Sequence, residues 1–169
     1  MITYKHTFTQ TEKEILDLIA DLRYKATSRE TIERQQNKKF PAEEIVKRGV
    51  YSEYVVSKYL NLHMNLDCNY RYDFGADLIT RGGQTIDVKC TDLEHGGIAT
   101  VPWTDRKDAD IFIGTYAPRD LSFCEVFGYM MREDLIKPSM LRTMKTADGD
   151  KEFYLVAKKE VKTFNDHRH

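Results

Sequence analysis

The part of the sequence that most constrains the fold is a hairpin pattern between residues 74 and 90. Apolar and polar residues alternate over 74–79 and again over 85–90, and the Arg-Gly-Gly at 81–83 is a turn signal. A three-residue turn with a left-handed glycine pairs Thr80 with Gln84. A two-residue turn would mix apolar and charged side chains, so the alternation selects the longer turn. The selected register gathers an apolar face from Phe74, Ala76, Leu78, Ile86, Val88 and Cys90.

The same register places two carboxylates, Asp77 and Asp87, directly across from each other. Opposed like charges destabilise a sheet, so the pair indicates a bound divalent cation. Carboxylates suit hard ions such as Mg²⁺ or Mn²⁺. Lys89 is predicted to share this face, where its ammonium group can stabilise charge on a phosphate or orient a metal-bound water. A metal ion lowers the pKa of such a water and makes it a nucleophile.

Helices are expected over the first sixty residues. Apolar residues recur at helical spacing after Thr9 and Thr11, which suit helix caps. A polar stretch over 27–39 predicts a second helix or a helical extension. Pro41 suits the first position of a third helix, whose apolar stripe continues as far as Asn61.

The second half of the sequence predicts a mainly antiparallel sheet with one or two helices. A helix is expected near Arg132, where acidic residues suit the first turn and Pro138 limits its length. This order indicates an α/β fold of the mixed α+β kind. The length favours one domain over 1–169, with a helical N-terminal extension (1–40), a core (41–130) and a C-terminal helix, strand and tail (131–169). Strands are predicted over 74–79, 85–90, 111–113, 123–130 and 153–156.

Composition narrows the functional classes. The 26 basic and 27 acidic side chains give a net charge of -1, which excludes a uniformly basic, histone-like binder but allows a local basic groove. No apolar run approaches the roughly 20 residues that span a bilayer, and no signal-peptide pattern is present. Three widely spaced cysteines do not form a disulfide framework, so we expect reduced thiols and a cytoplasmic protein.

Asp77, the hairpin and then Asp87-Val88-Lys89 together resemble the PD-(D/E)XK, or restriction-endonuclease-like, nuclease superfamily. The resemblance covers residues 41–130 and implies an αβββαβ core with a central mixed sheet. It also implies a metal-dependent deoxyribonuclease that hydrolyses phosphodiester bonds with Mg²⁺ or Mn²⁺ as cofactor. The family commonly has a glutamate on the preceding helix that points at the same metal site, and Glu53 fits that role. The proline of the family name is Ala76 here, and only a short helix, over 104–108, fits between Lys89 and the strand at 111–113.

The resemblance also assigns roles to residues. Asp77 and Asp87 would hold the metal, with the backbone carbonyl of Val88 as a further ligand and Glu53 completing the site or binding a second ion. Lys89 would position the attacking water. DNA is the expected partner, a homodimer is possible, and no membrane is involved. The small size and the lack of an ATPase motif are typical of a stand-alone nuclease, such as one encoded by a virus and acting in the host cytoplasm. Candidate DNA contacts are Arg106 and Lys107 near the site, and Arg34, Lys38, Lys39, Lys47 and Arg48 in the helical arm.

Several alternatives stay open from the sequence alone. Asp77, Asp87 and Lys89 could be solvated residues on the outer face of an amphipathic hairpin, and Glu53 could be an ordinary surface residue. The chain could also keep the nuclease fold without activity, as a DNA-binding or assembly module. A third alternative is a small α+β interaction protein with no nucleic-acid role. His95 is explained as well by a polar loop as by a catalytic role.

Overall fold

A five-stranded mixed sheet organises the molecule in the computed structural model, which describes residues 3–26, 41–66, 68, 76–100, 109–146 and 149–164. Its strands follow the order β1-β6-β5-β3-β2. Strands β3 and β5 run parallel, and the other neighbouring pairs are antiparallel. The strands are β1 (Tyr4–Thr7), β2 (Leu78–Ile79), β3 (Thr85–Thr91), β5 (Ile111–Tyr116) and β6 (Phe123–Met131).

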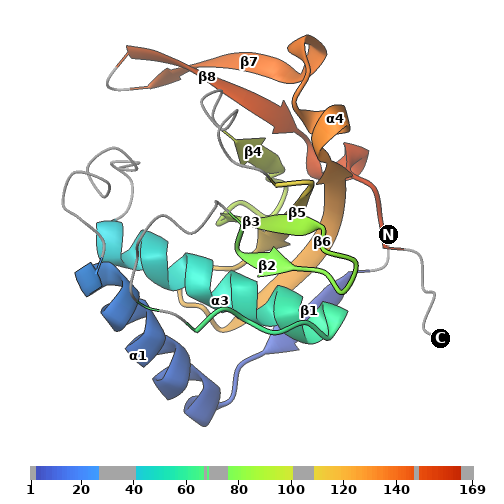
Figure 1. Cartoon of the computed structure of the whole chain (residues 1–169). Helices are drawn as coiled ribbons and strands as arrows, with labels where there is room; N and C mark the ends of the chain where they lie inside the picture. The colour runs from blue at the N-terminus through green and yellow to red at the C-terminus, as the bar shows by residue number, and fades with distance from the viewer. Residues whose placement is uncertain are drawn as a thin grey trace.

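Two helices, α1 (Gln10–Ala26) and α3 (Ala42–Leu60), pack side by side on one face of this sheet (Figure 1). Helix α1 begins with a capping box, in which the Glu12 amide donates to Thr9 Oγ1 over 3.2 Å and the Thr9 amide donates to Glu12 Oε2 over 2.8 Å. Helix α3 follows Pro41 and ends at Asn61, whose φ of 52° is the left-handed conformation that terminates helices.

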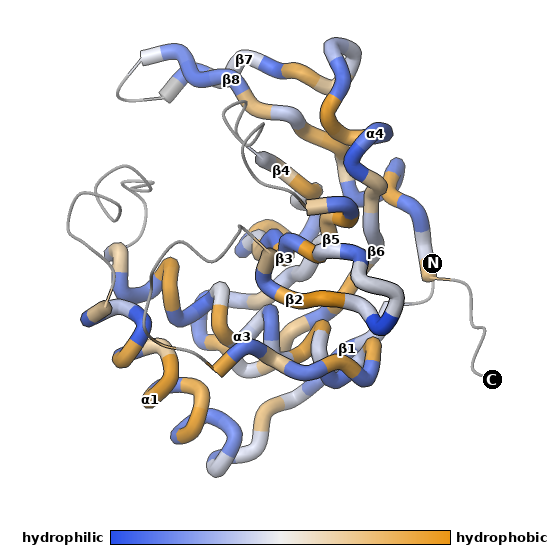
Figure 2. Tube along the Cα trace, in the orientation of Figure 1, coloured by the Kyte–Doolittle hydropathy of each residue, from blue (hydrophilic) through white to orange (hydrophobic). Residues whose placement is uncertain are grey.

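A three-stranded antiparallel sheet lies against the other face (Figure 1). It consists of β4 (Ile98–Thr100), β8 (Gly149–Val156) and β7 (Leu141–Thr146), in that order. The distal ends of β7 and β8 are hydrophilic, whereas β8 becomes hydrophobic toward the body of the molecule (Figure 2). Short helices α4 (Arg132–Leu135), η2 (Pro138–Met140) and η3 (Lys158–Glu160) complete the described secondary structure.

Each face of the five-stranded sheet packs into its own hydrophobic cluster. Ile86 and Ile113 belong to the cluster beneath the helices, together with Val55 of α3. Phe112 and Phe127 point the other way and pack with Ile98 of β4. The central strands β3 and β5 are therefore buried on both sides, as in a three-layer arrangement.

The structure confirms the predicted mixed α/β class and the turn register of the hairpin. Leu78 lies opposite Ile86, and the Thr80 amide donates to the Gln84 carbonyl over 2.8 Å. The pairing of β2 with β3 ends at Leu78, so it does not include the predicted opposition of Asp77 and Asp87. Instead, the Asp77 amide donates to the Ile86 carbonyl over 2.8 Å. Gly83 adopts the left-handed conformation expected at the turn, with φ 84°.

The alternative in which Asp87 is a solvated residue on the outer face of the hairpin is wrong. Asp87 is 1% exposed and lies beside Phe112 on β5, so the second cluster covers its face. Strands β1, β4 and β7 were not predicted. The helix expected over 27–39, the short helix over 104–108, Phe74 and the end of the polar tail lie outside the described residues. Among the described helices, none combines the length and the apolar character needed to cross a membrane.

Candidate active site

Asp77 sits where the chain enters β2 at the edge of the sheet. Its Oδ2 accepts a hydrogen bond from the Val88 amide over 2.7 Å. This bond fixes the first carboxylate of the predicted motif to the backbone between Asp87 and Lys89. The four residues of the motif, Asp77 and Asp87-Val88-Lys89, therefore form one local structure.

The side chains of Asp87 and Lys89 project from the same face of β3 and contact each other. Lys89 Nζ lies 2.8 Å from Asp87 Oδ2. The Asp87 side chain is 2% exposed, whereas the Lys89 side chain is 25% exposed. The ammonium group therefore compensates a buried carboxylate while remaining accessible from solvent. This excludes the alternative in which Asp87 is a solvated residue on an outer hairpin face.

Glu53 reaches the same region from the middle of α3. It is 8% exposed, which excludes an ordinary surface glutamate. Its Oε2 accepts a hydrogen bond from Arg23 Nη1 of α1 over 2.6 Å, and this ion pair is itself buried. Arg23 Nη2 also donates to the carbonyl of Asn65, over 2.6 Å. The guanidinium thus joins α1, α3 and the segment that follows α3.

The pKa of Asp77 reflects its burial and the charges of two other carboxylates. Enclosure of the Asp77 carboxyl raises its pKa well above the ordinary value, and the negative charges of Glu53 and then Asp87 raise it further. The hydrogen bond from Val88 and the charge of Lys89 oppose this shift only in part. Two neighbouring carboxylates thus act on Asp77, and each of them is paired with a basic side chain, Glu53 with Arg23 and Asp87 with Lys89.

Asp77 and Asp87 are the residues that could hold a small hard cation, because carboxylates are the ligands that such ions take. Mg²⁺ typically uses one or two protein carboxylates and keeps several waters, so it needs no complete protein cage. Within the residues that the structure describes, no group of three or more histidine, cysteine, aspartate or glutamate side chains is arranged to hold a metal ion. A two-carboxylate site agrees with this finding, because Arg23 engages the Glu53 carboxylate.

Of the candidate DNA contacts, the structure describes Lys47 and Arg48, and both make contacts within the protein. Arg106 and Lys107 lie outside the described residues, as do Arg34, Lys38 and Lys39. Lys47 contacts Asp17, with 2.7 Å between Nζ and Oδ1. The prediction that Arg48 contacts DNA is wrong, because its side chain is 5% exposed and donates hydrogen bonds to the carbonyls of Ala117 and Pro118. It holds the loop after β5 and cannot line a groove for DNA.

Arg23 is the charged residue of this region that the sequence did not reveal. It stands on α1, 30 residues before its partner Glu53. Its only sequence signal is a basic residue on the otherwise apolar side of α1, between the buried residues Leu16 and Ala20 and the helix end. Such a position indicates a buried ion pair but does not identify the partner.

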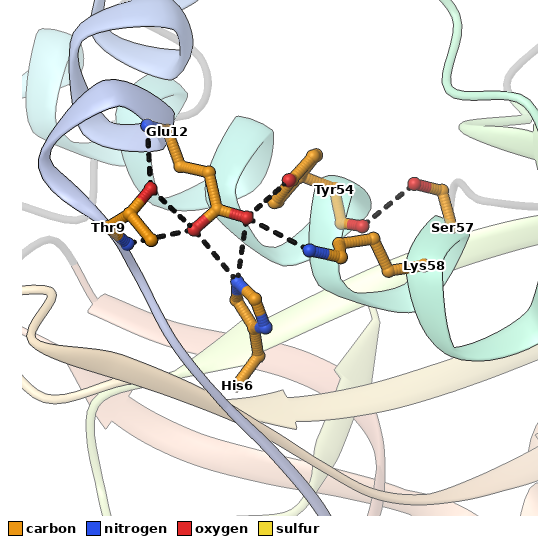
Figure 3. Close-up of polar contacts among 6 residues, drawn as sticks. All are labelled: His6, Thr9, Glu12, Tyr54, Ser57 and Lys58. Carbon is orange, nitrogen blue, oxygen red and sulfur yellow. Dashed lines mark hydrogen bonds and ion pairs between the residues drawn. The ribbon is translucent and has the colours of Figure 1, made fainter.

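A second polar cluster, around Glu12, joins β1, α1 and α3 (Figure 3). Glu12 accepts hydrogen bonds from Tyr54 Oη over 2.6 Å and from Lys58 Nζ over 2.9 Å, both on α3. His6 Nε2 of β1 lies 3.2 Å from each carboxylate oxygen, and Thr9 supplies the capping bonds. Burial alone would raise the pKa of Glu12, but these bonds, led by that from Tyr54, lower it well below its ordinary value. We call Glu12 with His6, Thr9, Tyr54 and Lys58 the Glu12 cluster.

Neither a protein-family model nor a curated protein matches the sequence. Asp77, Asp87, Lys89 and Glu53 are therefore interpreted from their geometry and chemistry, and the family resemblance stays a prediction.

Proposed function

We propose that the protein is a metal-dependent nuclease that hydrolyses phosphodiester bonds in DNA, on a restriction-endonuclease-like core. The observation that carries the proposal is the junction at Asp77. The Asp77 carboxylate is bonded to the amide of Val88, whose two chain neighbours, the buried Asp87 and the half-buried Lys89, contact each other. The charge of Glu53 on α3 acts on the same carboxylate. Two aspartates that meet beside a lysine support a site for Mg²⁺ or Mn²⁺, because Mg²⁺ is usually bound by one or two protein carboxylates and keeps several waters.

Each residue then has a defined task. Asp77 and Asp87 would hold the cation, which when bound supplies a water of lowered pKa and neutralises charge on the phosphate. The Val88 amide keeps the Asp77 carboxylate in place. Lys89, held by Asp87 and accessible from solvent, donates hydrogen bonds to the attacking water or to the phosphate oxygens. Arg106 and Lys107 are retained as proposed phosphate contacts.

Cleavage of plasmid and linear DNA in Mg²⁺ or Mn²⁺ tests this function directly. Asp87→Asn and Lys89→Ala should each lower the cleavage rate by roughly 100-fold or more, the size of effect seen when one electrostatic group of an active site is removed. The matched control variants are Asp150→Asn and Lys145→Ala, which change an exposed cross-strand pair on β7 and β8. Both controls should cleave like the unmodified protein.

The outcomes separate the alternatives that the sequence left open. Metal-dependent cleavage that is lost in both site variants and kept in both controls supports a nuclease. DNA binding without cleavage in any metal would instead indicate an inactive nuclease-like module. If the protein neither binds nor cleaves DNA, both the nuclease and the inactive DNA-binding module are contradicted, and the remaining alternative is an interaction protein with no nucleic-acid role.

A further inference from the structure

The buried ion pair between Arg23 and Glu53 connects the helical layer to the proposed cation site. The two side chains are 9% and 10% exposed, and their 2.6 Å contact is short for a hydrogen bond between charged groups. The second Arg23 nitrogen is engaged by the Asn65 carbonyl, which fixes the plane of the guanidinium. Glu53 is thus held by a rigid, permanently charged partner.

We propose that Arg23 is a positioning residue that reserves the Glu53 carboxylate, so that the resting site binds its cation through Asp77 and Asp87 without Glu53. This inference rests on the proposed function and deepens it, because it assigns a role to a residue outside the motif. The guanidinium binds Glu53 Oε2, and its positive charge repels a divalent ion that approaches the same carboxylate. Arg23 thereby limits the affinity of the site for divalent cations.

The positions of the carboxylates support this division of roles. Glu53 comes from α3, whereas Asp77 and Asp87 come from the sheet edge and are linked through the Val88 amide and Lys89. Glu53 is nonetheless close enough to act electrostatically on Asp77. Release of Glu53 from Arg23 would therefore add a carboxylate, and remove a positive charge, next to the same cation.

Calorimetric titration of the full chain with MnCl₂ tests the inference without any activity measurement. Arg23→Gln should bind Mn²⁺ about tenfold more tightly, the size of change produced by residues that orient metal ligands. Glu53→Gln should bind within about twofold of the unmodified protein, because Glu53 is not a ligand in the resting site. The double variant should lose the gain of Arg23→Gln.

The control is Lys25→Gln, which removes the same charge from an exposed position on α1. It should leave Mn²⁺ affinity unchanged. Tenfold weaker binding by Glu53→Gln, or unchanged or weaker binding by folded Arg23→Gln, would overturn the inference and make Glu53 a direct ligand or Arg23 purely structural. If circular dichroism shows that Arg23→Gln does not fold, the test rests on Glu53→Gln. Unchanged Mn²⁺ affinity of Glu53→Gln would then support the inference, and weaker Mn²⁺ binding would overturn it.

Asp87→Asn in the same titration separates this inference from the proposed function. Mn²⁺ binding that Asp87→Asn abolishes, but that Arg23→Gln does not tighten, contradicts the role of Arg23 alone. Absence of Mn²⁺ binding by the unmodified protein, or binding that Asp87→Asn leaves intact, contradicts the cation site itself and with it both proposals.

Discussion

The Glu12 cluster and the group around Asp77 use half-buried carboxylates in opposite ways. Glu12 accepts hydrogen bonds from the Thr9 amide and from Tyr54 and Lys58 on α3. His6 of β1 contacts the same carboxylate. These hydrogen bonds favour the charged form of Glu12. Asp77 receives one amide hydrogen bond and faces the negative charges of Glu53 and Asp87. The first arrangement stabilises the fold, whereas the second leaves an attraction for a cation.

The pKa values of the two carboxyl groups follow this difference. The pKa of Glu12 is lowered well below its ordinary value, and the pKa of Asp77 is raised well above its own. Surplus negative charge is what a folded protein normally avoids, and it is retained mainly where it does chemistry. The contrast therefore separates an acidic cluster that holds helices together from one that is suited to bind an ion.

The largest expected effect on stability is at Glu12. Glu12→Gln removes a charge that accepts bonds from Tyr54 and Lys58, and charge-assisted bonds are the stronger kind. We expect the free energy of unfolding to fall by about 2–3 kcal/mol, measured by urea denaturation. The control is Glu14→Gln on the same helix, where the carboxylate accepts an exposed hydrogen bond from Gln10. A loss of about 0.5 kcal/mol or less is expected there. Equal losses of stability in Glu12→Gln and Glu14→Gln would contradict the stabilising role of the Glu12 cluster.

A smaller effect of opposite sign is expected at Asp77. In the presence of a chelator, Asp77→Asn removes one of the mutually repelling charges, while the Asn oxygen can still accept from the Val88 amide. We expect the melting temperature to rise by roughly 2–4 °C, which corresponds to about 1 kcal/mol for a chain of this size. A site built for stability would instead be weakened by this substitution.

The pH dependence of stability distinguishes the two carboxyl groups further. Because the folded pKa of Asp77 is raised, the native state binds more protons than the unfolded state above the ordinary value of 3.8, and stability falls as pH rises through this window. The advantage of Asp77→Asn should therefore grow with pH. Because the folded pKa of Glu12 is lowered, its contribution is present above the ordinary value of 4.5 and is lost as pH falls below it. The penalty of Glu12→Gln should shrink on acidification, and the reverse trends would contradict the assignment.

Much of the fold was predictable because local patterns coincide with tertiary packing. The alternation around residues 81–83 gave the hairpin register, and apolar spacing gave α1 and α3. Strands β1 and β7, with the sequences YKHT and LRTMKT, carry little apolar alternation, and only pairing with β6 and β8 makes them strands. The burial of Asp87 could not be predicted, because the cover of its face comes from β4 and β8, far along the chain.

The candidate site shows the same limit. Asp77, Asp87 and Lys89 are close in sequence, so a hairpin register suffices to bring them together. Arg23 meets Glu53 only through the packing of α1 against α3, which no local pattern specifies. Only part of the Glu12 cluster can be predicted from the sequence. Thr9 and Glu12 have the spacing of a capping box. The contacts of Tyr54 and Lys58 with Glu12 depend on how the two helices pack.

The smallest expected effect is at Tyr54, and it tests whether the Glu12 cluster acts as a unit. Tyr54→Phe removes one donor, 2.6 Å from Glu12, and leaves Lys58, Thr9 and His6 in place. We expect a loss of about 0.5–1 kcal/mol, because the hydrogen bond is half-buried and water can replace part of it.

The matched control is Tyr4→Phe, which keeps the ring that stacks on Tyr59 and should be nearly neutral. In the double variant with Glu12→Gln, the Tyr54→Phe loss should shrink, because its effect depends on the Glu12 charge. Strict additivity would show that Tyr54 stabilises α3 independently of Glu12. In that case the Glu12 cluster would be a set of separate contacts, and only the group around Asp77 would behave as coupled charges.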